Sequence, residues 1–324
     1  MNQTELITTF YIDEKQLLLK PYQVYRIALD SGRVYYTLND VNEPTFYISL
    51  TTLTSGTLPT SPVLIKWMCD KGYAEAQRYM KERAVYGSLM HYAIGMFITT
   101  LKWDFDKVKD FVDLTITEGI TEYCKEGWHD DLNSDIAAFA QFVCDYKVKP
   151  MAVEIVLVSK DGYATLIDLV CKMTIQEDGL HETDVLKSGP NKGQPKKVKV
   201  DKEITALMNF KSGRHGFFDE HEIQLEFEKR LFQENYPEIK IDAIYNWAPK
   251  EWRKSPTYTL KDQSDSLNAV KAEALLAIAR IELIKKLPNS VVIEGIVPYG
   301  TEPVVGEYGV YDIVRNRHKE TKVK

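Results

Sequence analysis

The stretch Leu207 to Gly213, LMNFKSG, places polar residues at the end of an apolar run. Asn209 and Lys211 are two positions apart, so on an extended strand their side chains point to the same face. An oxygen ligand followed two residues later by lysine suits phosphodiester hydrolysis, because the oxygen helps to hold a divalent cation and the lysine offsets developing negative charge. The oxygen ligand in such a pattern is ordinarily Asp or Glu. Here it is asparagine, a neutral donor.

Carboxylates interrupt two other apolar runs, Glu154 in AVEIVLV and Asp168 in TLIDLV. A carboxylate buried in a strand costs several kcal/mol unless it is paired or holds a metal. The two runs are separated by Lys160-Asp161-Gly162, which predicts a hairpin with Asp-Gly at its turn. We therefore expect Glu154 and Asp168 to converge with Asn209 and Lys211 at one edge of a sheet.

Oxygen ligands of this kind favour Mg²⁺ or Mn²⁺, which polarise a phosphoryl oxygen and activate water. Each residue taken alone also has a structural interpretation. Asp168 is then an edge residue or a hydrogen-bonded structural group. Lys211 is then a charge that flanks a strand and opposes edge-to-edge pairing. Only the four residues together favour a site.

The elements that must position these residues follow from apolar spacing. Helices are expected near 63–72, 73–98, 104–124, 130–147, 219–236 and 266–287, and strands around Asp30-Ser31-Gly32 and at 151–173, 204–210 and 239–249. The polar segment 49–62 reads as a loop. The order predicts an α/β (α+β) protein with a mixed central sheet flanked by helices, rather than a regular βαβ repeat. We expect a β-rich extension over 1–60, a core domain over 61–290 and a strand with a polar tail over 291–324.

Composition places the chain among ordinary globular proteins, with 324 residues of which 44% are hydrophobic and 27% charged. No apolar run is long enough for a membrane span, and the N-terminus lacks the features of a secretory signal. We therefore expect a cytoplasmic protein that does not bind membranes. None of the four cysteines belongs to a CxxC pair, which disfavours a zinc ribbon and favours buried, reduced thiols.

A lysine-rich segment lies between Asp168 and Lys211, within an insertion at about 178–202 that predicts a basic β-hairpin. The net charge is −6, but KSGPNKGQPKKVKVDK carries six lysines against one aspartate. Such a surface can grip phosphates locally while the whole protein stays acidic. The candidate DNA-binding residues are Lys187, Lys192, Lys196, Lys197 and Lys199. The alternative is a solvated hairpin tip.

The order of these motifs resembles the PD-(D/E)XK nuclease superfamily, specifically its RecB-like exonuclease branch with Cas4-type and phage-encoded members. The helical motif G-x-x-x-H is matched by Gly87 to His91, and the acidic strand positions by Glu154 and Asp168. Asn209-Phe210-Lys211 stands at the D/E-x-K position, and Gln224 begins the final Q-x-x-x-Y motif. The resemblance spans roughly 45 to 250 and implies a restriction-endonuclease-like core.

The resemblance also implies roles for individual residues. As metal ligands it implies His91, Asp168 and Asn209, with Glu154 as a further carboxylate at or beside the metal. Lys211 would support the attacking water, and Gln224 would help to position this lysine. The implied activity is that of a DNA exonuclease acting on linear duplex or single-stranded ends in recombination, repair or replication, alongside phage recombination or replication proteins.

Two positions depart from the family pattern. Asn209 removes one negative charge from the site, and Glu228 stands where the last motif has tyrosine. No cysteine follows Cys171, so the iron–sulfur cluster of some relatives is not expected. The alternative function is therefore a nuclease fold impaired by Asn209, which binds DNA or a protein partner without cutting.

Overall fold

The computed structural model describes residues 24–29, 32–40, 43–100, 127–213, 217–287 and 321–322, which form a mixed α/β structure. The strands are β1 Tyr25–Leu29, β2 Gly32–Leu38, β3 Pro44–Ser49, β4 Lys149–Val158, β5 Tyr163–Val185, β6 Pro195–Phe210, β7 Ala243–Pro249, β8 Tyr258–Asp262 and β9 Thr321–Lys322. The helices are α2 Leu50–Thr57, α3 Pro62–Lys71, α4 Tyr73–Thr100, α6 Trp128–Asp145, α7 Asp219–Asn235, α8 Ser266–Glu282 and the short 3₁₀ helix η3 Ile284–Lys286.

The strands form one sheet in the order β8-β7-β6-β5-β3-β2-β1-β9, with β4 paired to β5. Pairs β6–β7, β3–β5 and β1–β9 are parallel and the remaining pairs are antiparallel, which makes the sheet mixed as predicted. The predicted hairpin is confirmed, because β4 and β5 pair antiparallel from Val158–Ala164, next to the turn, to Lys149–Lys172. Gly162 forms its turn with a φ of 88°, a left-handed conformation that glycine adopts at little cost.

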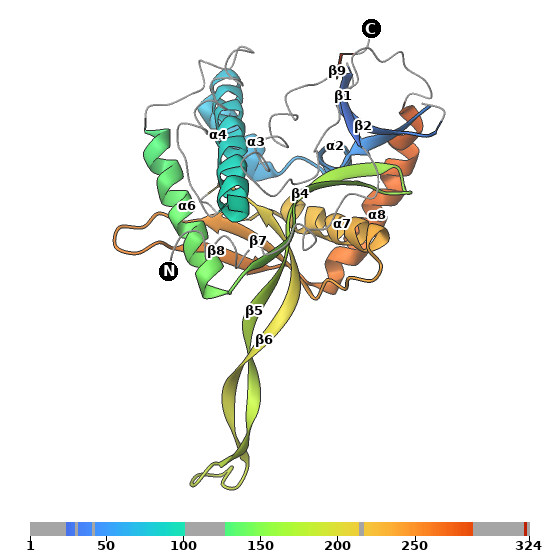
Figure 1. Ribbon diagram of the computed structural model, residues 1–324. Coiled ribbons are helices and arrows are strands. Elements are labelled where there is room, and N and C mark those ends of the chain that lie inside the picture. Colours follow the sequence, from blue (N-terminus) through green and yellow to red (C-terminus); the bar gives the residue numbers. More distant parts are fainter. Residues whose placement is uncertain are drawn as a thin grey trace.

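Helices cover both faces of the central strands, as Figure 1 shows. On one face, α4 and α6 pack with residues such as Phe139 against a buried cluster that includes Met208 and Trp247 of the sheet. On the other face, α2, α7 and α8 bury a second cluster around Phe227 and Leu276. Alternate residues of β6 join opposite clusters, with Leu207 facing α7 and Met208 facing α4. The sheet therefore separates two helical layers, and a side chain's position along a strand decides which layer it meets.

A long two-stranded arm extends from this body, built from the distal parts of β5 and β6 (Figure 1). The two strands pair continuously from Leu169–Met208 to Leu180–Lys197 and close near Val185–Pro195. The segment expected as a basic hairpin is the outer part of this arm. Because β5 and β6 also run through the core, the arm is a continuation of the sheet rather than a separate loop.

The expected loop over 49–62 is wrong in part, since 50–57 form helix α2. Leu50 and Leu53 are fully buried in the cluster shared with α7 and α8. The hydroxyls of Thr54 and Thr57 donate to the carbonyls of Leu50 and Leu53, so these polar residues are satisfied inside the helix. Burial of two leucines stabilises a helix that local composition disfavours.

The expectation of buried cysteines holds for Cys171 but is wrong for Cys69 and Cys144, which are exposed. Both lie on helices, where the side-chain direction follows from packing that composition does not reveal. The predicted helix at 104–124 and nearly all of the predicted tail at 291–324 lie outside the described residues. Among the helices that are described, none combines the length and apolarity needed to cross a bilayer.

The turn glycine Gly162 provides a test of this packing. An added Cβ would lie 2.9 Å from Ile284 Cγ2, whereas Gly189, with a similar φ of 87°, has nothing within 4 Å. Left-handed strain alone costs an alanine roughly 1–2 kcal/mol. We expect Gly162→Ala to lower the free energy of unfolding clearly more than Gly189→Ala, measured by urea denaturation. Equal losses would show that the contact with Ile284 does not constrain the turn.

Candidate metal centre and lysine site

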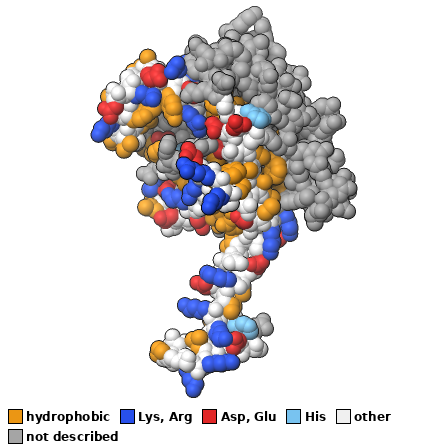
Figure 2. Space-filling view, turned by 90° about the vertical axis from the view of Figure 1, so that its left-hand side faces the viewer, with side chains coloured by type: hydrophobic (Ala, Val, Ile, Leu, Met, Phe, Trp, Pro, Cys, Tyr) orange, Lys and Arg blue, Asp and Glu red, His pale blue; other side chains and the backbone are white. Residues whose placement is uncertain are grey.

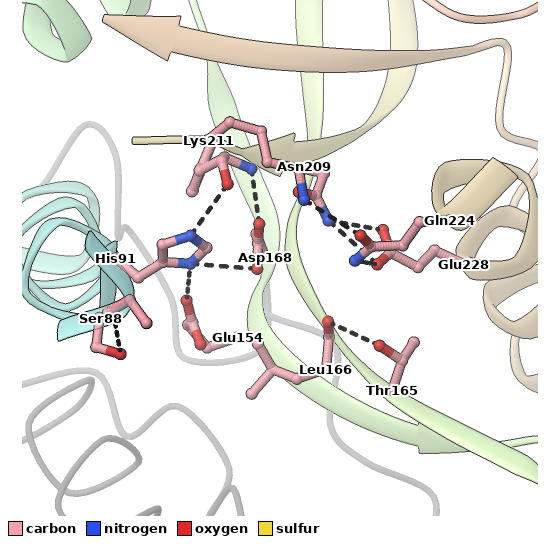
Figure 3. Close-up of polar contacts among 12 residues, drawn as sticks. Ser88, His91, Glu154, Thr165, Leu166, Asp168, Asn209, Lys211, Gln224 and Glu228 are labelled. Carbon is pink, nitrogen blue, oxygen red and sulfur yellow. Dashed lines mark hydrogen bonds and ion pairs between the residues drawn. The ribbon is translucent and has the colours of Figure 1, made fainter. Parts of the chain in front are cut away.

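Three potential ligands converge from separate elements, His91 from α4, Glu154 from β4 and Asp168 from β5 (Figure 3). His91 Nδ1 lies 3.5 Å from Glu154 Oε1 and 3.4 Å from Asp168 Oδ1. One ligand atom from each of the three residues falls within 4.8 Å of the others. The imidazole is one-fifth exposed, while both carboxylates are buried. Of the three side chains, the imidazole is the most exposed.

The hairpin places the two carboxylates opposite each other. Val153 pairs with Leu169 and Ile155 with Ile167, so Glu154 faces Asp168 across the strands. Glu154 has a φ of 52°, an unusual value for a residue other than glycine. Here β4 changes its orientation, since Val153 packs in the α4 layer and Ile155 in the α7 layer. A strained residue at a point of convergence is typical of a functional site.

Helix α4 reaches the end of β6 through three residues spaced four apart. Arg83 donates to the carbonyl of Ser212 at 2.8 Å, and His91 Nε2 lies 3.1 Å from the carbonyl oxygen of Phe210. Between them, a Cβ on Gly87 would lie 3.3 Å from Ser212 Oγ, so glycine permits the close approach. The G-x-x-x-H spacing therefore has a structural reason. Arg83 is part of the same face and was not identified from the sequence, although its spacing from His91 was a usable signal.

The chemistry of His91 suits a cation. The Phe210 carbonyl can only accept a hydrogen bond, so Nε2 carries the proton in this contact. The lone pair of a neutral ring would then be on Nδ1, facing two carboxylate oxygens. That arrangement is repulsive unless Nδ1 is protonated or a cation lies among the three atoms. One imidazole nitrogen and two carboxylates form a donor set that Mn²⁺ or Mg²⁺ accepts.

A second polar group lies on the other side of Asp168 in Figure 3 and joins β6 to α7. Lys211 Nζ donates to Gln224 Oε1 at 3.2 Å, and Gln224 Nε2 donates to Glu228 Oε1 at 2.7 Å. Asn209 Nδ2 donates to the same Glu228 oxygen at 3.2 Å. As expected from their spacing, Asn209 and Lys211 turn to one face, which proves to be the face covered by α7.

Asp168 connects the two groups. Its Oδ2 accepts a 2.7 Å hydrogen bond from the amide of Phe210, the residue between Asn209 and Lys211. Burial lowers the pKa of Lys211, while the negative charges of Asp168 and Glu228 act in the opposite direction. Burial, together with the charge of Asp168, raises the pKa of Glu228 to about 8. The site is therefore a set of coupled charges in a poorly solvated environment.

The structure thus brings together His91, Glu154 and Asp168, and beside them Asn209, Lys211 and Gln224. The metal role of Asn209 stays a prediction; the contact that the structure shows is the hydrogen bond from its amide nitrogen to Glu228. Glu228 itself was noted in the sequence only as a missing tyrosine. The available signal was its helical spacing, three residues after Leu225 and four before Phe232, which places a carboxylate on the apolar face of the helix, where an unpaired charge is unfavourable.

The arm lysines are less free than the sequence suggests. Lys196 is paired with Asp184, Lys199 with Asp178 and Lys202 with Glu177, all across the two strands. These lysines lower the pKa of both aspartates. Figure 2 shows acidic and basic side chains interspersed along the arm. Lys187 and Lys192, at the tip, are exposed, and the described residues form no ion pair with either.

The raised pKa of Glu228 predicts a pH dependence of stability in metal-free protein. Its pKa of about 8 in the folded protein lies above the ordinary 4.5, because burial opposes ionisation of the carboxyl. The folded state is therefore favoured most below pH 4.5, and this contribution to the free energy of unfolding is lost as pH rises through 8. We expect Glu228→Gln to gain stability relative to wild type between pH 5 and 9 by at least about 1 kcal/mol, since one pKa unit is worth about 1.4 kcal/mol. Chemical denaturation in EDTA measures this difference.

A matched control is Glu226→Gln on the same helix, whose carboxylate is buried but pairs with Arg230. Its stability difference from wild type should change much less over the same pH range. A Glu228→Gln difference that stays constant from pH 5 to 9 would contradict the raised pKa.

Comparison with models of known protein families finds no match to this chain, and comparison with curated proteins finds none either.

Proposed function

We propose that this protein is a metal-dependent DNA nuclease with a restriction-endonuclease-like core, of the PD-(D/E)XK type that its motif order resembles. The observation that carries the proposal is the convergence of His91, Glu154 and Asp168 from three elements beside a partly buried lysine, Lys211. Carboxylates are rarely buried unless they are paired or hold a metal. Two of them beside a histidine therefore mark a candidate functional site. From the motif order we propose, more specifically, that the protein is an exonuclease that acts on linear DNA ends.

The residues that would hold Mg²⁺ or Mn²⁺ are His91, Glu154 and Asp168, with the oxygen of Asn209 as a further ligand. When bound, the cation would supply Lewis acidity to the scissile phosphate and to water. The chain itself contributes orientation. The Phe210 amide fixes the carboxylate of Asp168, and the Phe210 carbonyl fixes the ring of His91.

Lys211 is the group that would act on the attacking water and the developing charge. Its ammonium is held by Gln224 at 3.2 Å and is close enough to Asp168 for the two charges to influence each other. A lysine in a poorly solvated site exerts a stronger field than one in water, because less solvent screens it. Gln224 sets the direction of this side chain, which is the supporting role the resemblance implies.

Binding without cleavage is the second candidate, and Asn209 is the observation that favours it. An amide at this position leaves the site with one carboxylate fewer than the D/E-x-K pattern provides. The direct contact of His91 with both carboxylates is also compatible with a protonated histidine that holds the core together. The protein would then bind DNA or a partner through the same surface.

Cleavage assays on linear and circular DNA, single-stranded and duplex, separate the two candidates. We expect degradation of linear DNA with Mn²⁺ or Mg²⁺ and none in EDTA. Asp168→Ala and Lys211→Ala should each lower the rate by about 100-fold or more, the usual scale for groups that stabilise charge in a transition state. Asp145→Asn, at the exposed end of α6, should cleave like wild type. If the wild-type protein cleaves no DNA with either metal, the proposal that it is a nuclease is refuted.

The free tip lysines predict how the arm contacts DNA. Each phosphate neutralised by a lysine contributes about 0.9 to the slope of log binding constant against log salt concentration. We expect Lys187→Ala/Lys192→Ala to weaken DNA binding and to lower that slope by up to about 2. Lys261→Ala, on β8 and paired with Glu222, is the control. Fluorescence anisotropy over a salt series measures both values, and an unchanged slope would mean that the tip does not contact DNA.

A further inference from the structure

Glu228 has no role in the chemistry described so far, yet it lies at the centre of the polar network. Its side chain is completely buried on α7, a helix whose neighbouring residues Phe227 and Leu231 pack in the apolar core. A buried carboxylate is unfavourable unless its oxygens are well bonded. Glu228 Oε1 accepts hydrogen bonds from two different amide groups, those of Asn209 and Gln224.

These two hydrogen bonds fix the orientation of both amides. A side-chain amide has a donor end and an acceptor end, and a carboxylate can bond only the donor end. Gln224 therefore presents its oxygen on the opposite side, where it accepts from Lys211. Asn209 is held in the same way, with Nδ2 toward Glu228. Its Oδ1 is buried and accepts no hydrogen bond from the described residues.

The position of Asn209 in the sheet makes this orientation significant. Leu169 pairs with Met208, so the next positions, Asp168 and Asn209, are neighbours on adjacent strands. On its other side, Asn209 pairs with Asn246, a fully buried residue that offers no carboxylate. Glu228 is therefore the acidic residue on α7 that contacts the side chain of Asn209.

We propose that Glu228 is a positioning residue that makes Asn209 a competent metal ligand, holding its amide nitrogen so that the buried Oδ1 is left to coordinate a cation. This inference rests on the proposed metal centre. Through Gln224 the same carboxylate positions Lys211, so one residue on α7 serves both the ligand and the lysine. The acidic residue expected at position 209 is thus found instead at position 228, on the adjoining helix α7.

The exchange of the two groups provides the test. In Glu228→Gln the new amide has only one acceptor for two donors, and the orientation of Asn209 is lost. In Asn209→Asp/Glu228→Gln the carboxylate returns to β6, and the new amide on α7 can donate to it. Asn209→Asp alone places two carboxylates about one hydrogen-bond length apart in a buried site, which is repulsive.

The measurement is Mn²⁺ binding to the full chain by isothermal titration calorimetry, for wild type and all three variants. Loss of a partner that orients a metal ligand typically weakens affinity by about 10- to 100-fold, and we expect this for Glu228→Gln. The double variant should recover most of that loss, and Glu228→Asp should bind more tightly than Glu228→Gln. Glu226→Gln, which leaves the network intact, should bind Mn²⁺ like wild type. Melting curves in EDTA establish that each variant folds.

A purely structural Glu228 gives a different pattern. Glu228→Gln would then bind Mn²⁺ as wild type does, or the double variant would bind no better than the single one, and either result overturns the inference. A wild type that binds no Mn²⁺ overturns it as well. A wild type that binds Mn²⁺ and shows the recovery, but cuts no DNA, refutes the nuclease and leaves the role of Glu228 standing.

Discussion

The site depends on the backbone of one residue, Phe210. Its amide donates to Asp168 at 2.7 Å, and its carbonyl oxygen lies 3.1 Å from His91. These two contacts join β6 to β5 and to α4, so the helical layer, the sheet and the carboxylate share one reference point. Because the contacts come from main-chain atoms, any residue except proline could make them at position 210. The two side chains adjacent in sequence, Asn209 and Lys211, are left free to face α7.

The sheet then divides the polar groups into two sets. His91, Glu154 and Asp168 gather where α4 meets the end of β6, and the hydrogen bond of Lys211 with Gln224 lies against α7. Asp168 belongs to both, which explains why its charge affects Lys211 and Glu228 together. Such coupling means that no single residue sets the charge state of the site. A substitution in either helical layer that alters the charge near Asp168 would therefore change the pKa values of groups on the other side of the sheet.

Sequence patterns predicted the mixed sheet, the hairpin at Gly162 and the residues that converge, because polar groups inside apolar strands are costly and therefore informative. They did not predict helix α2, where two leucines buried by distant helices outweigh local composition. Nor did they identify Glu228 or Arg83. Both act through contacts with residues far away in the chain, and a one-dimensional pattern does not contain such pairings. The arm lysines were recognised, but their carboxylate partners on the opposite strand depend on a register visible only in three dimensions.

The continuity of β5 has a geometric consequence. Asp168 and the arm tip lie on the same strand pair, whose pairing is regular as far as Leu180–Lys197 and shifts in register before Val185–Pro195. At about 3.3 Å per residue, the strand from Asp168 to Val185 extends for roughly 55 Å at most, less the effect of twist. That is the length of about 16 stacked base pairs at about 3.4 Å each. For the proposed DNA substrate, a duplex lying along the arm would have to be about this long to contact the tip and the site at the same time.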